Sequence, residues 1–403
     1  MPNLKPVGMS IALLLGSMSF ADPVICQLHP GVDPADIAST YDISFVEKTP
    51  HGDFFLFSAP AEQIESIEHA MNIDSRIVWS DTEEDIGIAE VDSFSKGGTL
   101  GVVGDPEAVY AQNVNLFGQL HWAPRFALFT IQVKVAVLDT GLSPMAESLW
   151  SNVISTQNQL TPGAQAYDLP DFAITEEDPA NFGAGHGTFV TGLIHTMAPN
   201  AALIIEKVAN SSGQATVWSI MRGVTDAVYQ DARIINISLG TTGESKALEK
   251  IFDWARSNGT ITVAPIGNGA SQGSLYPASF DSVICVAGVD ANDHKASFSN
   301  WHHEADFSAP ATGIKSTYWD GNLAIWSGTS FAAPQVTSAL ALAIGRGSKK
   351  SNGSLVNWLE SVGVSIDAAN PLYQNGLGSR IDFAAIDRIH FSSKMDSSKF
   401  GSE

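Results

Sequence analysis

The sequence Gly-Thr-Ser-Phe-Ala-Ala-Pro at 328–334 constrains this chain more than any other stretch. Small residues stand on both sides of one hydroxyl, and the apolar run 336–344 follows directly. This pattern predicts a helix that begins near Ser330. The unpaired N–H groups and the positive end of the dipole at a helix N-terminus favour a developing negative charge. An ordinary buried helix with small residues at its start would look the same, so this stretch alone leaves its role open.

Two other stretches supply the groups that a nucleophilic serine needs. The apolar run 134–138 ends in Asp-Thr-Gly, which predicts a buried strand with Asp139 at its carboxyl end. A Gly-His-Gly-Thr sequence places His186 at the start of a second apolar run, predicted as a helix. A serine nucleophile requires a base to take its proton and an acid to orient that base. Asp139, His186 and Ser330 provide these three groups.

The three blocks together resemble the catalytic blocks of the subtilisin-like serine proteases, and their order along the chain is that of subtilisin itself. The resemblance implies an α/β fold, a mostly parallel sheet with helices on both faces, and peptide hydrolysis by a Ser330 nucleophile, a His186 base and an orienting Asp139. It also implies that Asn268 and the backbone N–H of Ser330 form the oxyanion hole. The residues that it implies for substrate binding are Ser238, Leu239, Gly240, Pro265, Ile266, Gly267 and Leu275.

Substrate recognition follows from two of these segments. In the family, the segment Ser238–Gly240 pairs with the substrate backbone as an added strand, which holds a peptide without selecting its side chains. Leu275 stands where many relatives have glycine in the primary specificity pocket. We therefore predict a shallow pocket and a preference for small or medium apolar side chains before the cut. At the position of Phe189 the family commonly has a second histidine, which is not part of the catalytic triad.

Two further patterns suggest other sites. Residues 269–273 match the G-x-S-x-G motif of α/β-hydrolases, but the following Ser-Leu-Tyr-Pro is no helix start, as that motif requires. His302, His303 and Glu304 can each bind metal, but adjacent residues rarely converge on one ion, so we predict a solvated loop. No cofactor or metal is predicted. A calcium loop found in many relatives has no room here, and other calcium sites are left open but unsupported.

The N-terminal part predicts a separate small domain. Strands near 24–28, 43–47, 54–58 and 76–80 and helices near 34 onward and 61–71 give the order β-α-β-β-α-β, a ferredoxin-like domain. Its arrangement resembles the propeptides of subtilisin-like proteases, which assist folding and then block the cleft. The predicted partner is therefore the chain's own propeptide domain, acting as intramolecular chaperone and inhibitor. An accessory binding domain is the alternative.

The predicted organisation is a zymogen that is exported. Residues 1–21 have the features of a signal peptide, and an uncleaved membrane anchor is the alternative. The other predicted parts are a propeptide-like domain (22–92), a linker and cleavage zone (93–114), a catalytic domain (115–391) with a loop-like stretch at 149–182, and a disordered tail (392–403). We expect a secreted or periplasmic protein with no stable membrane anchor after signal cleavage. Cys26 and Cys285 are predicted as buried thiols, with a disulfide between them as the alternative.

The charge of the chain excludes some partners. The formal net charge is −22, and the stretch 22–107 holds 18 acidic and 3 basic residues. Nucleic acids and anionic membranes would repel such a surface. The resemblance to the subtilisin-like serine proteases implies a secreted serine endopeptidase acting on polypeptides. The competing hypothesis is a non-catalytic binding or inhibitory protein on the same fold.

Overall fold

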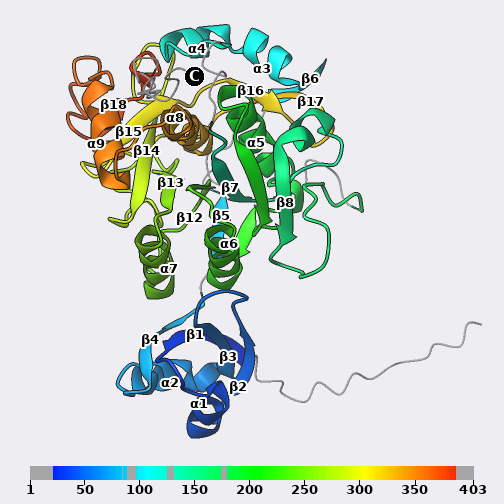
Figure 1. Ribbon diagram of the computed structural model, residues 1–403, viewed down its shortest axis with the longest axis vertical. Helices are drawn as coiled ribbons and strands as arrows, with labels where there is room; N and C mark the ends of the chain where they lie inside the picture. The colour runs from blue at the N-terminus through cyan, green and yellow to red at the C-terminus, as the bar shows by residue number, and fades with distance from the viewer. Residues whose placement is uncertain (1–20, 84, 89–96, 125–130, 174–178, 387–403) are drawn as a thin grey trace, which may run out of the picture. The chain divides into compact units, whose positions relative to one another are not determined.

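The computed structural model describes residues 21–83, 85–88, 97–124, 131–173 and 179–386 (Figure 1). They belong to two compact units. One is formed by Met1–Lys48 and Phe54–Thr82, and the other by Thr49–Asp53 and Glu83–Glu403. The predicted signal peptide and C-terminal tail lie outside the described residues, except for Ala21. The predicted domain boundaries remain predictions.

The first unit has the predicted β-α-β-β-α-β order. Its four strands form an antiparallel sheet in the order β2-β3-β1-β4, as in a ferredoxin-like fold. The first helix begins as predicted, with Pro34 at the first position and the Asp33 carboxylate accepting the N–H of Ala35. The elements are β1 (Ala21–Leu28), α1 (Pro34–Tyr41), β2 (Ser44–Lys48), β3 (Phe54–Pro60), α2 (Ile64–Met71) and β4 (Ile77–Thr82).

The second unit is built on an eight-stranded sheet in which all paired neighbours are parallel, in the order β18-β15-β14-β13-β11-β7-β9-β8 (Figure 1). The predicted α/β fold is therefore confirmed. The strands are β7 (Lys134–Asp139), β8 (Val153–Asn158), β9 (Ala202–Lys207), β11 (Ile234–Ile237), β13 (Ile261–Pro265), β14 (Val283–Val289), β15 (Phe307–Pro310) and β18 (Ser379–Arg380).

Helices cover both faces of this sheet. The helices α5 (His186–Met197) and α8 (Ala333–Gly345) share the main core with Val135 and Val137 of β7. Leu138, whose side chain alternates to the other face, lies against α6 (Val217–Tyr229) next to Gly223. The sequence predicts helices over 217–229 and 246–257, and α6 and α7 (Lys246–Ser257) have these bounds. Among the described helices, none is long and apolar enough to cross a membrane.

Two stretches contain elements that the sequence analysis did not predict. The loop-like stretch 149–182 includes β8, a polar edge strand whose one partner among the described strands is β9. The predicted linker 93–114 includes β6 (Gly97–Val103), which pairs with β17 (Asn322–Trp326), and α3 (Pro106–Gln112). Helix α3 has an Asp-Pro start like that of α1, directly after a glycine-containing segment.

Both cysteines are free and buried, as predicted. Burial raises the pKa of the Cys26 thiol to about 12 and also raises that of Cys285 well above its ordinary value. Both thiols are therefore held in the unreactive protonated form.

Glu206 is a buried carboxyl group on the face of β9 that α6 covers. Its Oε2 accepts a hydrogen bond of 2.7 Å from Gln159 Nε2. Burial, together with the nearby Asp226, raises the pKa of Glu206 well above its ordinary 4.5. The folded protein therefore keeps Glu206 protonated at pH values where the unfolded chain ionises it.

We expect Glu206→Gln to stabilise the fold, and the gain to grow with pH. The raised pKa favours the folded state below about pH 4.5, and this contribution is lost as the pH rises through the folded-state pKa. A neutral amide does not titrate, so the gain at pH 8 should be about 1–3 kcal/mol. The gain in the free energy of unfolding is measured by urea unfolding below about pH 4.5 and at pH 8. A Ser330→Ala background prevents self-digestion during the measurement. The partly exposed Glu249→Gln is the control, and a gain from Glu206→Gln that is equal below about pH 4.5 and at pH 8 contradicts the prediction.

Candidate active site

Asp139 lies at the carboxyl end of β7, between β9 and β11 in the middle of the sheet. Its carboxylate is fully buried, and Oδ1 lies 2.7 Å from Nδ1 of His186. The turn that follows is close-packed: the hydroxyl of Thr140 accepts the N–H of Gly187 at 2.8 Å. A Cβ at Gly187 would stand 2.4 Å from the Gly141 carbonyl oxygen, so only glycine fits there. The Asp-Thr-Gly segment at the end of β7 and the start of α5 are therefore in close contact through their backbones.

The imidazole of His186 is held by an aromatic wall as well as by Asp139. The Trp326 and Phe331 rings each lie 5.5 Å from it, centroid to centroid. Phe189, one turn along α5, packs on Phe331 at 4.6 Å. Phe189 stands where relatives commonly have histidine, and the structure explains this difference. Its ring packs against Phe331, one of the two aromatic rings that contact His186.

Asp168 positions the helix that carries His186, and the sequence analysis missed it. Its Oδ1 accepts the N–H of Gly185 at 2.8 Å, and its Oδ2 accepts the N–H and the hydroxyl of Thr188 at 2.9 and 2.6 Å. The carboxylate thus caps the first turn of α5, where N–H groups have no partner within the helix. Burial raises the pKa of Asp168, and Lys207 and these hydrogen bonds oppose that shift.

We expect Asp168→Ala to lower the free energy of unfolding by about 2–4 kcal/mol, because three hydrogen bonds to a buried carboxyl group are lost together with a helix cap. Asp168→Asn keeps an acceptor oxygen and should lose less. Urea unfolding of both variants in the Ser330→Ala background measures the loss. An Ala variant as stable as its parent contradicts this role.

Ser330 lies in the short turn Thr329–Phe331 that leads into α8. Its Oγ lies 3.3 Å from the carbonyl oxygen of Ser238, and the Ser238 hydroxyl donates to the Ser330 carbonyl at 3.0 Å. Asn268 Oδ1 accepts the N–H of Thr329 at 2.9 Å, which fixes the orientation of that amide. The structure thus joins Ser330 directly to Ser238, and the adjacent Thr329 to Asn268. Phe331, the next residue, contacts the His186 ring.

A strand lies beside the predicted substrate-binding segment. β5 (Asp85–Ile88) is the middle strand of a three-stranded sheet, with β10 (Gln214–Thr216) on one side and β12 (Leu239–Gly240) on the other. Both pairings are antiparallel. The backbone edge that the resemblance assigns to substrate is therefore paired with an earlier part of the same chain.

Leu275 lies between two of the other predicted binding segments. A Cβ at Gly240 would stand 2.9 Å from Leu275 Cδ1, and one at Gly267 would stand 2.7 Å from Leu275 Cγ. The Leu275 N–H donates to the Ile266 carbonyl at 2.9 Å, and Pro265 ends β13 just before. The structure thus brings Gly240, Ile266, Gly267 and Leu275 together, with the leucine side chain filling the space between the two glycines.

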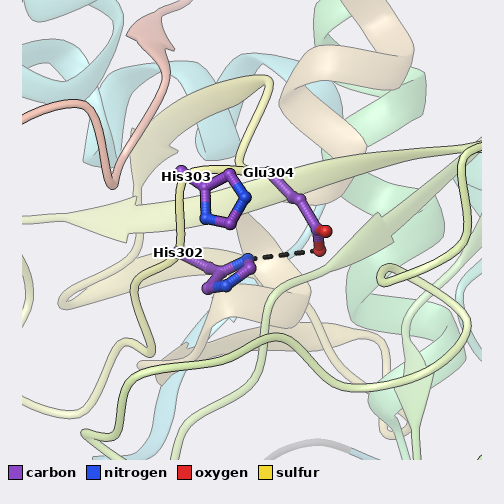
Figure 2. A group of neighbouring side chains, drawn as sticks. All are labelled: His302, His303 and Glu304. Carbon is purple, nitrogen blue, oxygen red and sulfur yellow. Dashed lines mark ion pairs between the residues drawn. The ribbon is translucent and has the colours of Figure 1, made fainter.

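The two other sequence patterns have different surroundings. Ser271 of the G-x-S-x-G motif is exposed in a bend, its hydroxyl donates to Asn300, and residues 272–276 directly after it form no helix. His302, His303 and Glu304 project from one loop, with their ligand atoms within 4.8 Å of one another (Figure 2). His302 Nδ1 and Glu304 Oε2 form an ion pair at 3.2 Å, and the ring centroids of His302 and His303 lie 4.0 Å apart with their planes tilted by 50°. His303 and Glu304 are exposed, as expected of a solvated loop.

Comparisons with known proteins agree with this geometry. A model of the subtilase family matches residues 130–362. An alkaline protease of Alkalihalobacillus alcalophilus is 35% identical over 254 residues, which are 61% of this chain and 62% of that protein. Subtilisin Savinase of Lederbergia lenta is 34% identical over 254 residues, 61% of this chain and 88% of that protein. This chain belongs to the subtilase family of subtilisin-like serine proteases.

The fold resemblance extends further along the chain than the sequence resemblance. The crystal structure of fervidolysin from Fervidobacterium pennivorans, a keratinolytic enzyme related to subtilisin, superimposes with a TM-score of 0.71. The match covers 92% of this chain and 62% of that one, at 17% identity, so it concerns the fold alone.

Proposed function

We propose that this subtilase is a serine endopeptidase that hydrolyses polypeptides through Asp139, His186 and Ser330. The observation that carries the proposal is the buried 2.7 Å contact between Asp139 Oδ1 and His186 Nδ1 in a member of a serine protease family. With Nδ1 facing the carboxylate, Nε2 is the ring atom that can take a proton from a hydroxyl. Ser330 at the start of α8 supplies that hydroxyl.

The proposed reaction has two stages. In the first stage, His186 takes the hydroxyl proton while Ser330 Oγ bonds to the scissile carbonyl carbon, and His186 then gives that proton to the leaving amine. In the second stage, water hydrolyses the ester. Asp139 stabilises the positive imidazolium in both stages. Asn268, whose Oδ1 is engaged by Thr329, would direct an amide N–H toward the oxyanion together with the Ser330 N–H.

The pairing of β5 supports synthesis as a zymogen. β5 follows the first unit directly in the sequence and pairs with β12 on the edge assigned to substrate backbone. A chain that fills this edge excludes substrate from it. Together with the predicted signal peptide at residues 1–21, this supports a secreted or periplasmic protein whose propeptide domain acts as its own inhibitor.

We expect cleavage to follow small or medium apolar side chains. Leu275 occupies the space between Gly240 and Gly267, so a large ring before the cut has no room. A peptide library assayed with the processed protein should show at least about tenfold higher kcat/KM for Ala or Val than for Phe at that position. Leu275→Gly should reduce the difference. Strong cleavage only after Phe or Tyr contradicts the prediction.

Hydrolysis of casein and of a quenched peptide library tests the proposal itself. Processed wild-type protein should degrade both substrates, and the Ser330→Ala variant should degrade neither. A folded and processed protein that hydrolyses no peptide would instead favour a non-catalytic binding or inhibitory protein on this fold.

A further inference from the structure

The turn that carries His302, His303 and Glu304 brings three adjacent side chains to one place. The chain reverses direction between His302 and Ala305, where the Ala305 N–H donates to the His302 carbonyl at 3.0 Å. Successive side chains of an extended strand point to opposite faces, but a turn removes that alternation. One ligand atom from each residue therefore lies within 4.8 Å of the other two (Figure 2). Adjacent residues rarely converge on one ion, but this turn gathers all three.

Backbone contacts on both sides hold this turn in place. The Trp301 N–H donates to the Ser271 carbonyl at 3.1 Å, and the Trp301 carbonyl accepts the Gly273 N–H at 3.0 Å. The His302 N–H donates to the Gly376 carbonyl at 2.9 Å. The turn is thus anchored to two other loops, so a ligand that binds its side chains meets a backbone that is already ordered and loses less affinity to ordering it.

A buried nitrogen of His302 has no hydrogen-bond partner among the described residues. This atom, Nδ1, lies 3.2 Å from Oε2 of Glu304, but the two atoms do not have the geometry of a hydrogen bond. An unsatisfied buried polar atom costs free energy, and a cation bound between the nitrogen and the carboxylate would recover it. His303 and Glu304 are exposed, so an ion from solvent can reach them.

We propose that His302, His303 and Glu304 bind a Zn²⁺ ion, with water completing the coordination. Two imidazole nitrogens and one carboxylate oxygen are a donor set that zinc accepts in open sites, whereas calcium and magnesium prefer oxygen ligands alone. Ligands about 2.0–2.1 Å from a tetrahedral ion lie about 3.3–3.4 Å from one another. The 3.2 Å between His302 Nδ1 and Glu304 Oε2 already has this spacing.

The third ligand needs only a small adjustment. The ligand atoms lie at most 4.8 Å apart, so His303 must approach the other two by no more than about 1.5 Å to reach tetrahedral spacing. An exposed side chain makes such a movement by rotation about its own bonds. The formal net charge of −22 also favours the approach of a cation. In the part of the chain that the structure describes, this is the one group of three such ligands at this spacing.

Zinc titration of the full-length chain tests the inference. Protein that carries Ser330→Ala, purified without a polyhistidine tag and stripped of metal, is titrated with Zn²⁺ in competition with a chromophoric chelator. We expect one ion per chain at this site, and Ca²⁺ at the same concentration should not displace it. His303→Ala and Glu304→Gln each remove one ligand, so each should weaken zinc binding at least about tenfold. The visible absorption of bound Co²⁺ should change in the same two variants.

His294→Ala is the matched control. His294 Nδ1 lies 3.5 Å from Asp290 Oδ2, which makes a second ion pair between an exposed histidine and a carboxylate. This pair belongs to no group of three ligands among the described residues. Removing His294 should therefore leave the affinity for zinc unchanged.

The outcomes separate this inference from the proposed function. A parent protein that binds zinc no more tightly than His303→Ala overturns the inference, and so does a His294→Ala variant that loses as much affinity. Displacement of zinc by Ca²⁺ would indicate a site of oxygen ligands and also overturn it. None of these ligand variants changes Asp139, His186 or Ser330, so the proposed function is judged separately, by peptide hydrolysis with the processed wild-type protein.

Discussion

Ser330→Ala is expected to lower kcat by about 10⁶, the size of the loss on removing the nucleophile of subtilisin. The hydroxyl is the atom that bonds to the scissile carbonyl, and alanine offers no replacement. Binding should persist, because the backbone edge at Ser238–Gly240 is unchanged. Hydrolysis of a quenched peptide by wild type and variant measures the ratio. A recognition site for an unrelated protease is introduced within residues 91–96 of both proteins. Cleavage by that protease removes the N-terminal propeptide-like domain, here called the leader, without self-cleavage.

Ser271→Ala is the matched control for this variant. Ser271 belongs to the G-x-S-x-G sequence but is exposed in a bend, so its removal should leave kcat within about twofold of wild type. A large loss with Ser271→Ala and a small one with Ser330→Ala would exchange the roles of the two serines and contradict the proposed mechanism.

Asp139→Asn should lower kcat by about 10⁴. An amide at this position cannot stabilise the imidazolium, and it can donate to Nδ1, which would turn the histidine to the tautomer that cannot accept the Ser330 proton at Nε2. The geometry itself should survive, since Asn has nearly the same size and Asp139 Oδ1 already accepts the Thr140 N–H at 2.8 Å. The same quenched peptide assay measures the loss.

Two comparisons make this prediction specific. The exposed Asp281→Asn, which makes the same chemical change far from His186, should keep full activity. Adding Asp139→Asn to Ser330→Ala should cost nothing further, because residues that act as one unit are not additive. A loss below tenfold with Asp139→Asn alone would mean that His186 does not depend on this carboxylate.

The sequence was enough to predict the elements that carry the candidate site. Asp139 ends one apolar run, and this pattern by itself indicates the end of a buried strand. His186 precedes another apolar run, and that pattern by itself indicates the start of a helix. Helices α6 and α7 carry the same kind of local signal, since each has a polar cap before a periodic apolar face.

The remaining features depend on contacts between distant segments. Asp168 caps α5 from a loop 17 residues before Gly185, and no local pattern distinguishes it from other loop acids. β8 is a polar edge strand whose partner β9 lies far along the chain. The register of β5 is of the same kind, because it follows from pairing with β12 more than 150 residues later.

Labelling with a fluorophosphonate is the most direct test of the claim that the buried Asp139–His186 pair activates Ser330. After leader removal, the wild-type protein should carry a single adduct, located by peptide mass on Ser330. Asp139→Asn should react far more slowly, and Ser330→Ala should not react at all. An unlabelled wild-type protein, or an adduct on any other residue, would contradict the assignment of Ser330 as the nucleophile.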